Sequence, residues 1–102
     1  MRKSVLLLAA LALVACSGSA FAADADRGKE FARRVCALCH VVMEGQNPRN
    51  PDAPSFQAIA TSQQFREKGM EVLEKNHTKM PNLALTQQQS DDVGAYIKSL
   101  AK

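Results

Sequence analysis

The sequence predicts an all-α fold with three main helices, and three observations support this prediction. Helix-capping side chains are followed by apolar residues three and four positions apart, which is helical spacing. No segment alternates apolar and polar residues as a half-buried strand does. The stretch 44–54 is rich in proline and asparagine and is therefore predicted to be a loop.

The first 22 of the 102 residues have the layout of an export signal. Arg2 and Lys3 precede an apolar run, and small residues end the segment at Ala22. The apolar run is too short to span a membrane. We therefore expect a signal peptide over residues 1–22 and an exported, periplasmic domain over residues 23–102.

A second route of processing stays open at the N-terminus. Residues 13–16, Leu-Val-Ala-Cys, resemble a lipobox. In that case the signal would be residues 1–15, and a lipidated Cys16 would tether the same exported domain to a membrane.

The predicted mature chain is short and nearly neutral. Removing the signal leaves 80 residues and, with the loss of Arg2 and Lys3, lowers the formal charge from +3 to +1. Such a balance does not indicate a nucleic-acid partner. A chain of this length buries one small core and usually recruits a disulfide, a metal, a cofactor or a partner. We expect a single monomeric domain with such an internal support.

The first predicted helix covers residues 27–38, with Asp26 as its N-cap. Phe31, Val35 and Leu38 follow one another at spacings of four and three. These three residues are therefore expected to form the buried face of the helix.

The second predicted helix begins at Thr61 and ends near Asn76. Thr61 is followed three residues later by Gln64, which is the pattern of a capping box. The expected buried face of this helix consists of Phe65, Gly69, Val72 and Leu73.

The third predicted helix repeats the capping pattern with Thr86 and Gln89. Its apolar residues follow the i, i+3, i+4, i+7 rule and are Val93, Tyr96, Ile97 and Leu100. Between the second and third helices, Met80 precedes Pro81, so it is expected to be extended and outside regular structure.

The segment Cys36-Ala37-Leu38-Cys39-His40 carries the predicted chemistry. Two thiols three positions apart lie on one face of a helical turn, where both can reach the vinyl groups along one edge of a haem. The histidine that follows is placed to bind the iron with its imidazole. We therefore predict one covalent haem c, attached through Cys36 and Cys39, with His40 as an axial ligand.

Three other uses of these cysteines fit the sequence less well. A dithiol of the thioredoxin kind follows a strand, and no strand is predicted before Cys36. A structural zinc ion needs four ligands; His77 would supply one, but the adjacent Cys39 and His40 converge poorly on a tetrahedral ion. A disulfide between Cys36 and Cys39 would close a small, strained ring that stabilises little.

With these residues in view, the chain resembles the small class I c-type cytochromes of bacteria over essentially all of residues 23–102. Gly28 lies eight residues before Cys36, as the family's N-terminal glycine does, and residues 96–100 resemble its C-terminal helix signature. The resemblance implies helices and loops wrapped around one covalent haem. It also implies that Gly28 admits the Tyr96 ring where the two terminal helices cross.

The resemblance also assigns a role to Pro54. In the family, the carbonyl of a proline at this place accepts a hydrogen bond from the second nitrogen of the ligand histidine, which fixes the tautomer. Pro54 would orient His40 in this way. The alternative, a proline that merely stiffens the loop, stays open because Pro48 and Pro51 lie in the same loop.

Met80 is the predicted second axial ligand. It lies 40 residues beyond His40, and residues 76–81 resemble the ligand loop of the family. His77 is the rival, and a site with two histidines would have a lower reduction potential. The preference of soluble electron carriers for a His and Met pair favours Met80.

These ligands predict an electron carrier and not an enzyme, because side chains would fill both axial positions of the iron. The expected partners are larger redox proteins: a quinol-oxidising complex, a terminal oxidase or a periplasmic dehydrogenase. The alternative is a haem-based gas sensor or ligand-binding module with weak peroxidase activity, in which Met80 detaches. The residues expected to form the apolar shell are Phe31, Leu38, Phe56, Ile59, Val72, Leu83 and Leu85.

Overall fold

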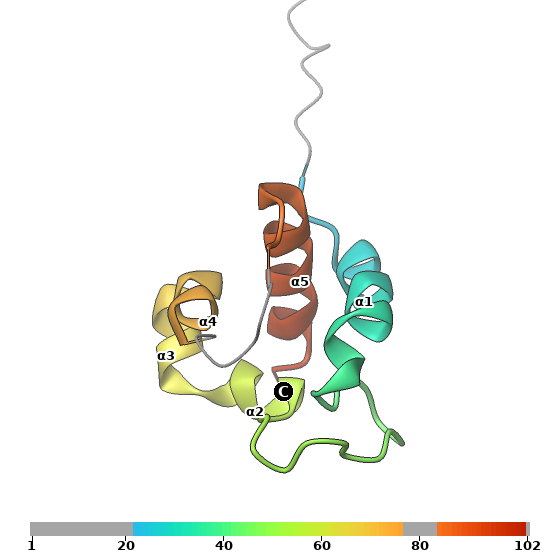
Figure 1. Cartoon of the computed structure of the whole chain (residues 1–102). Helices are drawn as coiled ribbons and strands as arrows, with labels where there is room; N and C mark the ends of the chain where they lie inside the picture. The colour runs from blue at the N-terminus through green and yellow to red at the C-terminus, as the bar shows by residue number, and fades with distance from the viewer. Residues whose placement is uncertain (1–21, 77–83, 102) are drawn as a thin grey trace, which may run out of the picture.

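The computed structural model describes residues 22–76 and 84–101, which form helices and loops without a strand. Figure 1 shows α5 between α1 on one side and the α3–α4 pair on the other, with α2 near one end. The all-α prediction is confirmed. Within these two ranges, no helix is long and apolar enough to cross a membrane. The elements in chain order are α1 (Ala25–Arg34), the 3₁₀ turn η2 (Cys36–Leu38), α2 (Phe56–Thr61), α3 (Gln63–Lys68), α4 (Met70–Asn76) and α5 (Gln87–Ser99).

Helix α1 begins at Ala25, two residues earlier than predicted, because its N-cap is Asp24 and not Asp26. One carboxylate oxygen of Asp24 accepts hydrogen bonds from the backbone N–H groups of Asp26 at 2.8 Å and Arg27 at 3.2 Å. These bonds satisfy two N–H groups that have no partner within the helix. Asp26 lies instead in the first turn, where a negative charge is favourable.

The buried face of the first helix differs from the predicted one. Ala32 is fully buried, whereas Val35 and Leu38 are 38% and 63% exposed. The buried positions Gly28, Ala32 and Cys36 lie four residues apart on one face. Small side chains along this face let α1 approach α5 closely. Phe31 is partly buried against the same core, whereas Val35 and Leu38 are turned toward solvent.

Gly28 lies at the closest point of this approach. A Cβ atom at Gly28 would lie 1.9 Å from the carbonyl oxygen of Asp92 and 2.9 Å from the amide nitrogen of Val93. Gly28 therefore faces the backbone of α5, and its contact with the Tyr96 ring stays a prediction.

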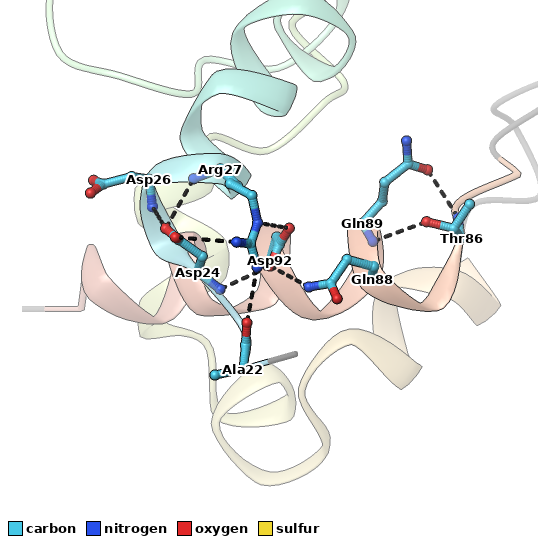
Figure 2. Close-up of polar contacts among 8 residues, drawn as sticks. All are labelled: Ala22, Asp24, Asp26, Arg27, Thr86, Gln88, Gln89 and Asp92. Atoms are coloured by element: carbon cyan, nitrogen blue, oxygen red, sulfur yellow. Dashed lines mark hydrogen bonds and ion pairs between the residues drawn. The ribbon is translucent and has the colours of Figure 1, made fainter. Parts of the chain in front are cut away.

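A polar cluster joins the same two helices beside this crossing (Figure 2). The buried carboxylate of Asp92 accepts hydrogen bonds from Arg27 Nε at 3.0 Å, the Asp24 backbone N–H at 2.8 Å and Gln88 Nε2 at 2.9 Å. The hydrogen bond from Arg27, the other two bonds and the positive charge of Arg27 together lower the pKa of Asp92 to about 2. The charged form of Asp92 is thus stabilised by folding.

This lowered pKa predicts how stability depends on pH. Because the pKa of Asp92 falls from its ordinary 3.8 to about 2 on folding, its contribution is complete above pH 4 and is lost as the pH drops through 2. We expect Asp92→Asn to be less stable than the wild type at pH 7, and this difference to shrink between pH 4 and 2. Urea unfolding of both proteins across this range measures the difference. Ser62→Ala, which removes an uncharged helix cap, is the control and should show a constant difference.

The middle of the chain forms three short helices where one was predicted from Thr61 to Asn76. Ser55 caps α2 through a hydrogen bond from the Ala58 N–H to its hydroxyl, and Ser62 caps α3 in the same way through Phe65. Thr61 is the last residue of α2, so the cap predicted there is wrong. Gly69, with φ of +60°, then separates α3 from α4.

Helix α5 confirms the third prediction. Thr86 and Gln89 form the expected capping box, with the Gln89 N–H donating to Thr86 Oγ1 at 3.1 Å and the Thr86 N–H to Gln89 Oε1 at 3.0 Å (Figure 2). The predicted apolar face is buried at Val93, Tyr96 and Ile97, and Leu100 is partly buried against the same core.

Candidate haem site

The two cysteines and the histidine lie on the turn that follows α1. The chain leaves the helix at Val35 and forms η2, where the N–H groups of Cys39 and His40 both donate to the carbonyl of Cys36, at 3.1 and 2.8 Å. These bonds hold Cys36 and Cys39 one turn apart, with His40 directly after them. Both thiols are free; Cys36 is buried and Cys39 is partly exposed.

His40 is oriented by the loop that precedes α2. Its side chain is 6% exposed, and Nδ1 lies 2.6 Å from the carbonyl oxygen of Pro54. A carbonyl only accepts, so Nδ1 carries the proton and Nε2 has the lone pair that a metal requires. The hydrogen bond expected at Pro54 is present, whereas the role of His40 as an iron ligand stays a prediction.

An apolar cavity lies beside this histidine. Its wall brings together the turn, α2, α4 and α5, and apolar side chains dominate it. Phe56, Ile59 and Leu85 lie in this wall as expected, but Phe31, Leu38 and Val72 do not, and Leu83 lies outside the described residues. The lining residues are Cys36, His40, Phe56, Ile59, Met70, Leu73, Glu74, Leu85, Val93 and Ile97.

The donor set and the apolar lining of this cavity have the chemistry that a haem requires. A porphyrin needs an apolar enclosure, a thiol within reach of its edge and a nitrogen donor for its iron. Cys36 and His40 share one cavity with apolar side chains, and Cys39 follows one turn after Cys36.

The surroundings of Cys36 differ from those of a redox-active dithiol. Burial raises the pKa of the Cys36 thiol to about 11. Catalytic Cys-x-x-Cys pairs instead have a lowered pKa, which supplies the reactive thiolate. Within residues 22–76 and 84–101, no group of three or more His, Cys, Asp or Glu side chains could hold a metal ion.

The second axial ligand is predicted in the segment that follows α4. Met80 and its rival His77 both lie outside the described residues. Helix α4 ends just before them, and its residues Leu73 and Glu74 line the cavity.

Two residues hold the turn in place through hydrogen bonds that were not predicted from the sequence. The Tyr96 hydroxyl donates to the carbonyl of Val42 at 2.6 Å, and Gln46 forms hydrogen bonds with the backbone on both sides of Val41. Tyr96 was predicted as part of an apolar face and as the ring beside Gly28, and its hydroxyl was given no role. A glutamine in a loop has no periodic neighbours, so only the folded chain reveals its partners.

Helices without a strand in the described ranges, a Cys-x-x-Cys-His turn and a buried, oriented histidine beside an apolar cavity define a c-type cytochrome. A family model for cytochrome c matches residues 25–101, and the chain belongs to that family. The chain is 44% identical over 91 residues to cytochrome c-552 of Bradyrhizobium diazoefficiens, which covers 88% of each chain. No solved structure matches at a significant level. The protein is thus a small bacterial class I cytochrome that binds haem c covalently and carries electrons between redox partners.

Proposed function

We propose that the protein is a periplasmic one-electron carrier whose haem iron is held between His40 and Met80 and whose porphyrin is attached through Cys36 and Cys39. The observation that carries this proposal is the buried His40 ring, held through Nδ1 by Pro54 at 2.6 Å in the cavity that it shares with Cys36. This arrangement presents Nε2 as the iron-binding nitrogen.

Each residue has a defined part in this proposal. When bound, the haem supplies a one-electron couple between ferric and ferrous iron. Pro54 fixes the tautomer of His40, and the Met80 thioether is a soft donor that favours ferrous iron. The apolar wall, including Phe56 and Ile59, excludes water and disfavours the more highly charged ferric state, which raises the potential.

The proposed location follows from the N-terminal segment. Residues 1–22 would direct export and be removed before Ala23, or residues 1–15 would be removed and Cys16 lipidated. In both cases the folded domain lies outside the cytoplasm. The proposed partners are a quinol-oxidising complex, a terminal oxidase or a periplasmic dehydrogenase.

The sixth ligand can be tested by spectroscopy of two variants. The oxidised wild-type protein should show the near-infrared band of sulfur bound to ferric iron. We expect Met80→Ala to abolish this band and His77→Ala, the matched control in the same segment, to leave it intact. The reverse pattern would falsify the Met80 assignment.

Carbon monoxide separates the carrier from a gas sensor. If Met80 closes the coordination sphere, the ferrous wild-type protein should bind carbon monoxide very slowly at neutral pH, and Met80→Ala should bind it rapidly. Rapid binding by the wild type would favour the sensor or peroxidase alternative instead.

A further inference from the structure

We propose that Gln46 is a positioning residue that sets the orientation of His40 by holding its backbone. This inference rests on the proposed role of His40 as iron ligand. Gln46 bonds the backbone of His40, whereas Pro54 holds the imidazole ring itself.

Both ends of the Gln46 side-chain amide are used. Its Oε1 accepts a hydrogen bond from the Val42 N–H at 2.9 Å, and its Nε2 donates to the His40 carbonyl at 2.7 Å. A longer bond of 3.4 Å joins Nε2 to the carbonyl of Ala37, between the two cysteines. One half-buried side chain therefore joins the Cys-x-x-Cys segment, the histidine and the chain that follows it.

Neighbouring anchors hold other atoms of the same segment. The Phe56 N–H donates to the carbonyl of Val41 at 2.8 Å, and the Tyr96 hydroxyl donates to the carbonyl of Val42. The bond from Gln46 reaches the carbonyl of His40 itself. The Pro54 carbonyl holds the imidazole ring of His40, and Gln46 holds its backbone carbonyl. The two contacts together therefore restrain the side-chain torsion angles of His40 from both ends.

The chemistry of this position suits glutamine. Glutamate keeps an acceptor for the Val42 N–H but has no donor for the His40 carbonyl when it is ionised. Methionine has nearly the same length and lacks both groups. In either variant the carbonyl of His40 loses the hydrogen bond from Gln46, so we expect the peptide group to shift and to change the angle at which the imidazole meets Pro54.

Nuclear magnetic resonance of the oxidised holoprotein tests this inference. The hyperfine-shifted signals of the haem methyl groups and the axial histidine report the orientation of the axial ligands. We expect Gln46→Met and Gln46→Glu to move these signals, and Gln46→Met to raise the unfolding equilibrium constant roughly tenfold or more. Thr86→Ala, which removes the α5 cap, should destabilise to a similar degree and leave the signals in place.

The possible outcomes distinguish the role of Gln46 from the proposed ligation of iron by His40. If the Gln46 variants lose stability but keep the wild-type histidine and methyl signals, Gln46 only stabilises the loop and the inference is wrong. If Gln46→Met does not fold, Gln46→Glu decides, because it keeps the acceptor for Val42. A wild-type spectrum without an axial histidine would overturn the proposed ligation, and this inference with it.

Discussion

Gly28→Ala is expected to lower the free energy of unfolding of the holoprotein by about 3 kcal/mol or more. The new Cβ would lie 1.9 Å from the Asp92 carbonyl oxygen and 2.4 Å from its carbonyl carbon. Both atoms belong to the backbone of α5, so no change of rotamer can relieve the overlap. The helices would have to separate, which would also strain the hydrogen bonds between Arg27 and Asp92.

Gly94→Ala is the matched control for this substitution. Gly94 lies inside α5, and its nearest neighbour would be the Met70 side chain, with Cγ at 2.8 Å. A methionine side chain can move aside, and alanine favours a helix over glycine by about 1 kcal/mol. We expect Gly94→Ala to lie within about 1 kcal/mol of the wild type.

Chemical denaturation of the two variants, monitored by far-ultraviolet circular dichroism and haem absorbance, measures the effect. Equal stability of Gly28→Ala and Gly94→Ala would show that α1 and α5 can separate without cost. In that case the close approach at Gly28 would not hold the two terminal helices in register.

The same position shows how far the sequence predicted the helix crossing. The resemblance to the small class I cytochromes implied close packing of the terminal helices at Gly28, which the structure has. The contact of Gly28 with the backbone of Asp92 was not predicted, because contact between two backbones leaves no pattern in side-chain periodicity. The prediction that Val35 and Leu38 are buried was wrong for a related reason. The close crossing of two helices requires small residues, whereas a search for helical periodicity identifies the large apolar ones.

Of the three predicted helix caps, the one at Thr86 is present, whereas those at Asp26 and Thr61 are wrong. The box of Thr86 and Gln89 begins a helix of thirteen residues, which is long enough to show a clear apolar period. Helix α2 has a Ser55 cap, but its six residues are too few to show a helical period. The change of direction at Gly69 is set by a positive φ that a glycine in a periodic segment does not reveal.

Some residues of the candidate site could be predicted from the sequence and others could not. Cys36, Cys39 and His40 follow from a motif in which order and spacing are both fixed, and the structure places them on one turn. Gln46 bonds backbone groups, which every residue type has, so no sequence pattern indicates its role. Met80 rests on spacing and resemblance, and the variants described above decide it.

Replacing both Cys36 and Cys39 with serine is expected to abolish covalent haem attachment completely. Serine hydroxyls do not form thioethers with vinyl groups, so no covalent link would retain the porphyrin when the iron ligands release it. The apolar cavity would then lose its haem, and the predicted mature chain of 80 residues has few other sources of apolar burial. We therefore also expect a large loss of helical content after the haem is extracted.

Acid acetone extraction of protein made in a host competent in cytochrome maturation measures the first effect, and circular dichroism of the extracted chain measures the second. Cys16→Ser is the matched control because Cys16 lies in the predicted signal segment, so this variant should keep all of its covalent haem. Extraction-resistant haem in the double variant would mean that another side chain forms the attachment. Loss of haem in Cys16→Ser alone would place that cysteine in the site and contradict the assignment of the Cys-x-x-Cys-His turn.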